Sequence, residues 1–398
     1  MGSPSKEGLT NRTKTPIGFN ASWCVRGKSR LSQCQLCADV CPTSAIKYEQ
    51  LPVLHVEACN LCGLCLHTCP VGAFIGEDGV SDLLRCCKEL GLPSTVELSC
   101  KRNPRPDYGP LCEGAVIQTN QCLAMIGPSV YFGLYAQGVR SIRIRLEMCS
   151  SCPIGNLKDA IFSVAQQAWV FAEGMGGALE VHAITQPGEG WGVREVFSTQ
   201  RPPFSRRSFF RLAAMEAAGA TAKLLLDQAQ DDTQQRGLPL ERRRLLAALA
   251  ELKANSGLSP REKPAAFPRF TRLTVVDEAC NACGACARAC PTQALEGVVR
   301  KEDGLDTFHL AFSVQRCVNC GICRDICPKQ ALTESGKPFF HELIEESPRI
   351  LFKRTMRQCS RCKVQFIDMS GEKSFCPKCI RQRSIYERLT VSRNSMPI

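Results

Sequence analysis

The residues with the clearest capacity for chemistry are the cysteines, of which the chain has 27 among 398 residues. Between residues 280 and 327 they form two copies of the pattern CxxCxxCxxxCP. In this spacing three close thiolates bind three corners of a 4Fe-4S cube, and the fourth Cys reaches across to the other cube. Zinc sites use CxxC pairs without a third Cys two residues on. The pattern therefore predicts two 4Fe-4S clusters, one on Cys280, Cys283, Cys286 and Cys327 and the other on Cys290, Cys317, Cys320 and Cys323.

This stretch, with CNACGACARACP followed by CVNCGICRDICP, resembles the bacterial dicluster ferredoxins. Gly284 and Gly321 let the backbone pass close to a cluster, where amide groups can point at sulfur. Pro291 and Pro328 fix the turn after each crossing Cys. The resemblance implies two buried clusters that pass single electrons. We place this dicluster region, called module 2, at residues 269–340.

A second set of cysteines near the N-terminus predicts another dicluster region, called module 1, at residues 21–79. The second of its two runs is complete, but in the first run Leu31 replaces the first Cys and Gln35 replaces the glycine. A loop can bring Cys24 in as the missing ligand. The alternative is a 3Fe-4S centre with a free Cys24. The predicted ligands are Cys24, Cys34, Cys37 and Cys69 for the first 4Fe-4S cluster, and Cys41, Cys59, Cys62 and Cys65 for the second.

Residues 80–186 alternate strand-like apolar segments with stretches of helical length, which predicts a small α/β domain with a parallel sheet. The expected strands are VELSC, AVIQT, IRIRLEM and ALEVHAI, and the expected helices are SDLLRCCKEL, GPSVYFGLYAQG and NLKDAIFSVAQQAWVFAEG. Cysteines follow the ends of three of these strands. Because α/β sheets build their sites at the carboxyl ends of parallel strands, we expect a site at this edge.

Within this domain, the segments CLAMIGPSVYFGLYAQGV and IRIRLEMCSSCPIGN resemble the iron-sulfur (delta) subunit family of methyl-viologen-reducing hydrogenases. The resemblance implies a 2Fe-2S centre, with Gly155 and Asn156 downstream of its Cys pair. Its implied ligands are Cys100, Cys122, Cys149 and Cys152. The alternative is a domain of structural cysteines without metal. The cysteines left over are expected to be small buried hydrophobes: Cys86, Cys87 and Cys112.

The remaining parts of the chain are a connector and a C-terminal ribbon. Residues 187–268 are charged and Pro-rich, which predicts a connector with helices at about 207–227 and 239–254. Residues 341–398 carry two CxxC knuckles separated by thirteen residues, an arrangement that predicts a zinc ribbon with a structural or docking role. A rubredoxin-type iron site is the alternative. The predicted zinc ligands are Cys359, Cys362, Cys376 and Cys379.

The overall charge gives little support for nucleic-acid binding. The formal charge of +12 treats every Cys as neutral. Each of the six predicted sites carries about two negative charges with its thiolates, so the filled sites would offset the basic excess. Iron-sulfur ligation needs reduced thiolates, which favours the cytoplasm of an anaerobe or facultative anaerobe. The first 20 residues are expected to be flexible, and no apolar run reaches the roughly twenty residues of a membrane span.

The sequence therefore predicts a multidomain α+β and α/β protein with two ferredoxin-like modules flanking a parallel-sheet domain. With five His and no zinc-protease helix, nucleophile elbow or phosphate loop, electron transfer is the expected role. We expect an electron-transfer subunit of a soluble multi-subunit oxidoreductase. Family resemblance gives its partners as a hydrogenase, formate dehydrogenase or aldehyde oxidoreductase subunit and a flavin subunit like that of heterodisulfide reductase. The alternatives are an iron-sulfur regulator that binds nucleic acid or protein, and an autonomous reductase.

Overall fold

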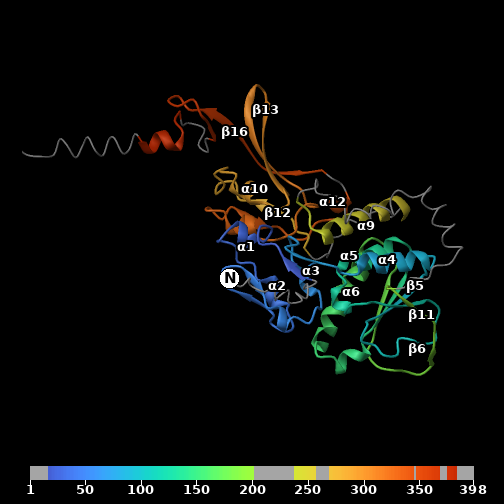
Figure 1. Ribbon diagram of the computed structural model, residues 1–398. Coiled ribbons are helices and arrows are strands. Elements are labelled where there is room, and N and C mark those ends of the chain that lie inside the picture. The colour runs from blue at the N-terminus through green and yellow to red at the C-terminus, as the bar shows by residue number, and fades with distance from the viewer. Residues whose placement is uncertain (1–16, 201–236, 257–268, 345–346, 368–373, 383–398) are drawn as a thin grey trace, which may run out of the picture. The chain divides into compact units, whose positions relative to one another are not determined.

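The computed structural model describes residues 17–200, 237–256, 269–344, 347–367 and 374–382. The chain forms two compact units, whose elements are drawn in Figure 1. Among the described residues, the first unit contains 17–24, 35–166 and 180–200. The second unit contains 25–34, 167–179 and the described residues from 237 onward. None of the described helices is long and apolar enough to cross a membrane.

In the first unit, the region of module 1 consists of very short elements around its cysteine loops. Two antiparallel strand pairs, β1 with β4 and β2 with β3, are joined by single helical turns. Their bounds are β1 (Ile17–Phe19), α2 (Leu36–Asp39), β2 (Ile46–Tyr48), β3 (Pro52–Leu54), η1 (Val56–Ala58), α3 (Leu64–Thr68) and β4 (Phe74–Gly76). The core combines Ile17, Ile46 and Phe74 with Cys37 and Cys65. Because so small a region buries little apolar surface, its cysteines are a large part of its core.

The rest of the first unit is an α/β domain with a five-stranded parallel sheet, so the predicted parallel sheet is confirmed. The strand order is β11-β7-β5-β8-β9. The strands are β5 (Thr95–Ser99), β7 (Ala115–Gln118), β8 (Ser141–Arg145), β9 (Glu180–Ile184) and β11 (Val196–Ser198). The helical segments are α4 (Val80–Glu89), η2 (Leu123–Met125), α5 (Pro128–Ala136), η3 (Glu147–Ser151), η4 (Gly155–Leu157) and α6 (Lys158–Gly174), of which α6 belongs to the first unit up to residue 166.

The central strands of this sheet are apolar because helices cover them. Leu98, Ile117 and Ile144 are fully buried, as expected for parallel strands between helical layers. Helices α4 and α5 lie side by side in Figure 1, with the Leu84 side chain 3.7 Å from the position that a Cβ on Gly133 would take. The crossover connections bring the carboxyl ends of β5, β7 and β8 to the same edge of the sheet.

The α/β domain extends beyond the predicted boundary at residue 186. Strand β11 pairs in parallel with β7 at the edge of the sheet. Strand β10 (Trp191–Val193) pairs antiparallel with β6 (Tyr108–Pro110). Residues 187–200 therefore belong to the α/β domain rather than to the predicted connector. This extension could not be predicted, because strands of three residues are too short to show a periodicity.

The second unit contains module 2, built on two antiparallel sheets. Strand β12 pairs with β15, and the other sheet has the order β13-β14-β16-β17, with β13 and β14 forming a long hairpin that is visible in Figure 1. The strands are β12 (Leu273–Val275), β13 (Leu295–Glu302), β14 (Leu305–Phe312), β15 (Leu332–Glu334), β16 (Arg349–Gln358) and β17 (Gln365–Ile367). Strand β16 lies in the region assigned to the ribbon but pairs with β14 of module 2, so the sheet of module 2 extends past the predicted boundary at residue 340.

The helices of the second unit are short except for one. They are α1 (Val25–Lys28), α9 (Leu240–Ser256), α10 (Ala285–Ala289), α11 (Ile322–Asp325) and α12 (Phe340–Ile344). Helix α9 corresponds to the helix expected at 239–254, and it buries Leu245, Leu249 and Leu252. The helix expected at 207–227 lies outside the described residues.

Candidate metal centres

The two cysteine runs of module 2 have the same backbone conformation. The residue before the second Cys of each run is left-handed, with φ of 51° at Ala282 and 48° at Asn319. The glycine after that Cys is also left-handed, with φ of 66° at Gly284 and 79° at Gly321. Residues with a Cβ are sterically strained in the left-handed conformation, which explains why each run has a glycine at this position. This turn directs backbone amide groups toward sulfur. One example is the N–H of Ala282, which donates to Cys280 Sγ.

The first predicted quartet of module 2 surrounds a small cavity of about 20 Å³. Phe308 and Leu310 line the same cavity. Burial, with a smaller effect of the neighbouring thiolates, raises the pKa of Cys286 to about 11. Ionised thiolates this close together need a compensating cation, and iron would supply that charge. The sulfur atoms around this cavity are those of Cys280, Cys283, Cys286 and Cys327.

The second predicted quartet of module 2 also meets in one place. Burial, with a smaller effect of the Cys290 thiolate, raises the pKa of Cys317 to about 11 and that of Cys320 to about 12. Cys323 lies close to all three of these cysteines and to Cys286 of the other quartet. The structure thus brings Cys290, Cys317, Cys320 and Cys323 together.

In both modules a backbone amide donates to the sulfur of each crossing Cys, an interaction that sequence reasoning missed. The donor is always an alanine four residues further on, in the segments CPTSA, CPVGA, CPTQA and CPKQA. The residue before each alanine is left-handed, which turns the amide toward the sulfur. The N···S distances are 3.2 Å for Ala45 to Cys41, 3.2 Å for Ala73 to Cys69, 3.2 Å for Ala294 to Cys290 and 3.3 Å for Ala331 to Cys327. The alanine that all four segments share, four residues after the Cys, was the feature of the sequence that could have indicated these hydrogen bonds.

The second predicted quartet of module 1 has the same geometry as module 2. Leu61 and Gly63 are left-handed, with φ of 53° and 72°. Burial raises the pKa of Cys65 to about 12, and nearby thiolates add to the effect. The sulfurs that meet here are those of Cys41, Cys59, Cys62 and Cys65.

The first run of module 1 differs in backbone as well as in sequence. Gln35, at the glycine position, has φ of −131° rather than a left-handed value. Cys37 and Cys69 pack on the core of module 1, and Cys24 is 8% exposed. Cys34 belongs to the segment 25–34 of the second unit, in which the Gln33 amide donates to Asp325 at 3.2 Å. The ligand set Cys24, Cys34, Cys37 and Cys69 stays a prediction.

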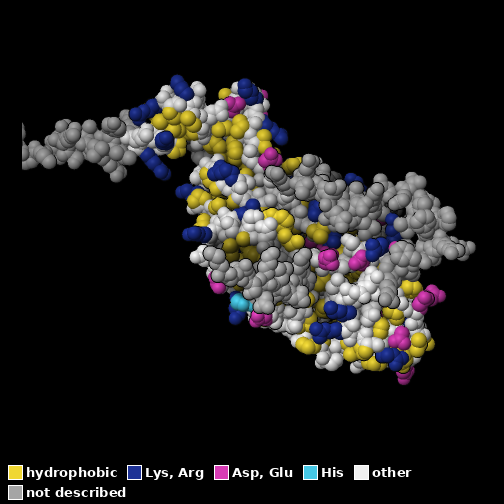
Figure 2. All heavy atoms as spheres, in the orientation of Figure 1, with side chains coloured by type: hydrophobic (Ala, Val, Ile, Leu, Met, Phe, Trp, Pro, Cys, Tyr) yellow, Lys and Arg dark blue, Asp and Glu magenta, His cyan; other side chains and the backbone are white. Residues whose placement is uncertain are grey.

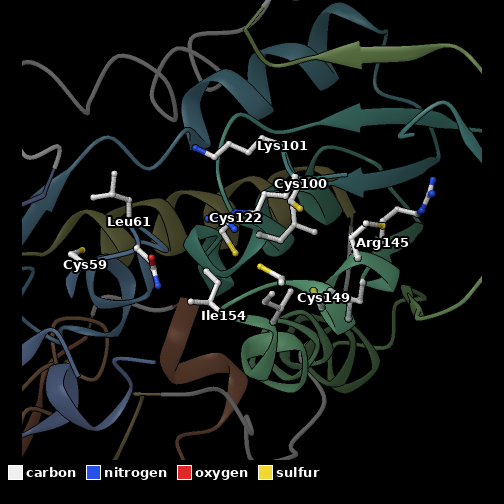
Figure 3. Close-up of a pocket in the computed structure, with 15 residues that line it drawn as sticks. Cys59, Leu61, Cys100, Lys101, Cys122, Arg145, Cys149 and Ile154 are labelled. Carbon is white, nitrogen blue, oxygen red and sulfur yellow. The ribbon is translucent and has the colours of Figure 1, made fainter. Parts of the chain in front are cut away.

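In the α/β domain, the four cysteines after the strand ends line one cavity of about 280 Å³ (Figure 3). Burial raises the pKa of Cys122 to about 11 and that of Cys149 to about 12. The nearby thiolates of Cys100 and Cys152 also contribute to the raised pKa of each of these two thiols. Four convergent thiols and an amide of Ala124 that donates to Cys122 fit a bound iron-sulfur centre.

A buried ion network fixes the strand ends beneath this cavity. Arg145, which lines the cavity, donates to Glu97 at 2.9 Å and to Glu147 at 2.6 Å. Glu97 also accepts from Arg194 at 2.8 Å, and its side chain is 1% exposed. The loop after Cys149 closes tightly, because a Cβ on Gly155 would lie 1.7 Å from the Cys149 carbonyl oxygen. Only glycine fits at that position.

The same cavity is lined by the second cysteine run of module 1. Cys59, Asn60 and Leu61 form one side of it, and Cys59 and Leu61 are labelled in Figure 3. The Nε2 atom of His67 lies 2.9 Å from the carbonyl oxygen of Ala124, within hydrogen-bonding distance. A Cβ on Gly63 would lie 2.4 Å from the Met125 side chain, so glycine is also required for this close approach. Two predicted metal centres are therefore neighbours within the first unit.

The cysteines outside these groups behave in two ways. Cys86 and Cys87 are fully buried in α4, as expected for small hydrophobes. Cys112 does not fit that expectation, because it is half-buried and its sulfur contacts the guanidinium groups of Arg143 and Arg194.

The C-terminal cysteines form a compact group of four sulfur atoms, all within 4.8 Å of one another. A tetrahedral ion with Zn–S bonds of about 2.3 Å separates its ligand sulfurs by roughly 3.8 Å. The observed Cys362 to Cys376 distance is 3.6 Å. Backbone amides, that of Cys362 first, lower the pKa of Cys359 to about 6, so a thiolate is favoured there. The four residues, Cys359, Cys362, Cys376 and Cys379, fit one tetrahedral ion, zinc or iron.

Comparison with known proteins bears on module 2. Residues 279–331 match the family described as a 4Fe-4S dicluster domain. This segment is a ferredoxin-type dicluster domain. The chain is also 36% identical over 52 residues to the ferredoxin-type protein NapF of Haemophilus influenzae, a match that covers 12% of the chain and 30% of NapF. It is 32% identical over 68 residues to an uncharacterized ferredoxin of Methanocaldococcus jannaschii, covering 16% of the chain and 44% of that ferredoxin. The chain therefore spans less than half the length of either relative.

Proposed function

We propose that the protein is the iron-sulfur electron-transfer subunit of a multi-subunit oxidoreductase. The dicluster domain and the ferredoxin relatives support an iron-sulfur electron-transfer role. Bound clusters supply one-electron oxidation and reduction, and the chain's cysteines, amides and apolar side chains hold and insulate them. The proposed cofactors are four 4Fe-4S clusters, a 2Fe-2S cluster in the α/β domain and one Zn in the ribbon.

The observation that carries the proposal is the shared cavity of the first unit. Cys59 of module 1 and the four cysteines of the α/β domain line the same space of about 280 Å³. Cys62 is also close enough to Cys122 that its thiolate would raise the pKa of that thiol. Two redox centres set this close can exchange electrons directly, with Leu61, Leu123 and Ile154 limiting the access of water.

We propose two kinds of partner, on the resemblance of the α/β domain to the hydrogenase delta subunits. One is an oxidoreductase subunit of the hydrogenase, formate dehydrogenase or aldehyde dehydrogenase type, and the other is a flavin subunit like that of heterodisulfide reductase. The arrangement calls for a cytoplasmic complex, because reduced thiolates are needed for cluster assembly.

The test is to purify the protein without air from its source organism and to identify the subunits that copurify. Electron paramagnetic resonance of the reduced sample should show magnetic coupling between a cluster of module 1 and the centre of the α/β domain. The variant Cys122→Ser should abolish this coupling, and the matched control Cys86→Ser should retain it. A reduced sample without coupling would contradict the proposed relay.

The surface of the ribbon favours one other function, that of a redox-sensitive regulator that binds nucleic acid. Figure 2 shows Lys and Arg side chains around exposed apolar side chains in this part of the molecule. The exposed residues include Arg361, Lys363, Lys378, Arg381 and Val364. This function requires DNA binding at physiological ionic strength whose affinity falls as salt increases. If the protein does not bind DNA at that ionic strength, the regulator function is excluded and electron transfer is the one proposed function that remains.

A further inference from the structure

The sulfur of Cys37 has a hydroxyl group as its neighbour. The Tyr48 oxygen lies 3.1 Å from the Cys37 sulfur. A thiolate that binds iron has no proton to give, so the tyrosine hydroxyl is the donor in this hydrogen bond.

The local structure holds the hydroxyl in place. Tyr48 ends strand β2, opposite Pro52 of β3, and its half-buried ring packs on the core of module 1. Cys37 is only 7% exposed. A hydrogen bond to a charged acceptor is stronger in such weakly polarisable surroundings than in water.

The matching position in module 2 carries no side chain. Tyr48 is the seventh residue after Cys41, and the seventh residue after Cys290 is Gly297. A Cβ on Gly297 would lie 3.0 and 3.2 Å from two ring carbons of Phe308. That phenylalanine lines the cavity surrounded by Cys286 and its three partner cysteines. An apolar ring therefore covers the module 2 site, whereas module 1 presents a hydroxyl group to Cys37, the counterpart of Cys286.

The crossing Cys of each matched site accepts the same kind of amide hydrogen bond. The amide of Ala73 donates to Cys69 at 3.2 Å, and that of Ala331 donates to Cys327 at 3.3 Å. The two matched sites therefore share this hydrogen bond, and the tyrosine hydroxyl supplies a donor to Cys37.

We propose that Tyr48 is a tuning residue whose hydroxyl group makes the cluster bound by Cys37 easier to reduce than it would be without that hydrogen bond. The inference rests on the proposed function, because it requires iron at Cys37. The step is a one-electron reduction by an external low-potential donor, in which no bond forms or breaks and the phenol keeps its proton. Reduction places more negative charge on sulfur, so the donated hydrogen bond stabilises the reduced state more than the oxidised one.

The test is a redox titration of the full chain, purified without air and reduced with dithionite, followed by electron paramagnetic resonance. The signal of the Cys37 cluster is identified as the one altered by Cys37→Ser. In Tyr48→Phe, which keeps the ring, we expect the midpoint potential of this signal to become more negative. The equilibrium constant for its reduction should fall about threefold to tenfold, and tenfold corresponds to about 59 mV.

Two controls separate the hydroxyl from packing. Tyr108→Phe removes a hydroxyl from a ring that packs against Trp191, and it should leave the midpoint unchanged. The Fe–S stretching bands of the cluster should also lose a deuterium-sensitive component in Tyr48→Phe. If Tyr48→Leu shifts the midpoint and Tyr48→Phe does not, the ring acts by excluding water and the inference is overturned.

An unchanged midpoint and unchanged stretching bands in Tyr48→Phe would also overturn the inference, while leaving the electron-transfer function in place. A spectrum that Cys37→Ser does not alter would also overturn the inference, because no cluster would then be bound by Cys37. The function itself would be contradicted by a different result, wild-type protein that lacks iron in both modules.

Discussion

Modules 1 and 2 carry nearly the same cysteine spacing, yet three of their four runs share one backbone and the fourth does not. The runs that begin at Cys59, Cys280 and Cys317 each have a left-handed residue before the second Cys and a left-handed glycine after it. In the first run of module 1, Gln35 takes the glycine position with φ of −131°. The fourth run lacks both the first Cys and the glycine, so the left-handed loop occurs only in the runs that carry the complete motif, glycine included.

The largest expected effect compares one ligand in each module. Cys286→Ala and Cys37→Ala should each remove one cluster, which is about four of the roughly eighteen iron atoms expected for the full chain. The remaining clusters should keep their spectra, because each module has its own core. Iron and sulfide analysis of protein purified without air gives the measurement. A loss confined to Cys286→Ala would show that the first run of module 1 binds no cluster.

The next effect decides the role of Cys24. In Cys24→Ser we expect the loss of about one iron atom and the signal of an oxidised 3Fe-4S centre, because three cysteine ligands remain. Leu31→Cys in the same chain should restore the four-iron cluster, since Leu31 occupies the position of the missing ligand. Unchanged iron and an unchanged spectrum in Cys24→Ser would remove Cys24 as a ligand.

A smaller effect tests the glycine rule directly. Gly284→Ala should destabilise the protein by about 1 to 2 kcal/mol, because it forces a left-handed alanine. Gly63→Ala should cost more, since the Met125 side chain must also move. Gln35→Ala is the matched control and should stay within about 0.5 kcal/mol. Denaturant unfolding of the cluster-loaded chain measures all three, and equal losses in Gln35→Ala and Gly284→Ala would refute the rule.

The smallest effect distinguishes cysteines that are protected from chemical modification by a bound metal centre from cysteines that are protected by burial. With clusters in place at pH 8, iodoacetamide should modify Cys112 and spare Cys86, because burial raises the pKa of Cys86 to about 11 and the thiolate is the reactive form. Labelling of Cys86 should rise between pH 8 and pH 10 as its thiolate fraction grows. Chelation of iron at pH 8 should expose the module cysteines and leave Cys86 protected. Mass spectrometry gives the rates, and equal labelling of Cys86 and Cys112 at pH 8 would contradict this assignment.

Much of the fold could be predicted from the sequence where the pattern was long. The four expected strands of the α/β domain correspond to β5, β7, β8 and β9, because each lies in a short segment rich in β-branched and other apolar residues. The three-residue strands β10 and β11 could not be predicted, since no period fits in three residues. The long hairpin of β13 and β14 was also not predicted. It lies between the two cysteine runs of module 2, and the cysteine spacing carries no information about strands.

The candidate sites follow the same division. Spacing was enough to group the quartets of module 2, where sequence neighbours supply most ligands. It could not indicate the 3.1 Å contact between Tyr48 and Cys37, which depends on strand pairing rather than on cysteine spacing. Nor could it show that Leu61 and Cys122 line one cavity, because that proximity arises from packing between residues far apart in the chain.

The most direct test of the account is the iron and acid-labile sulfide content of the protein, purified without air from its source organism. The account predicts a coloured protein with about eighteen iron atoms per chain, from four 4Fe-4S clusters and one 2Fe-2S cluster. A colourless protein that lacks iron yet remains folded and active would contradict it.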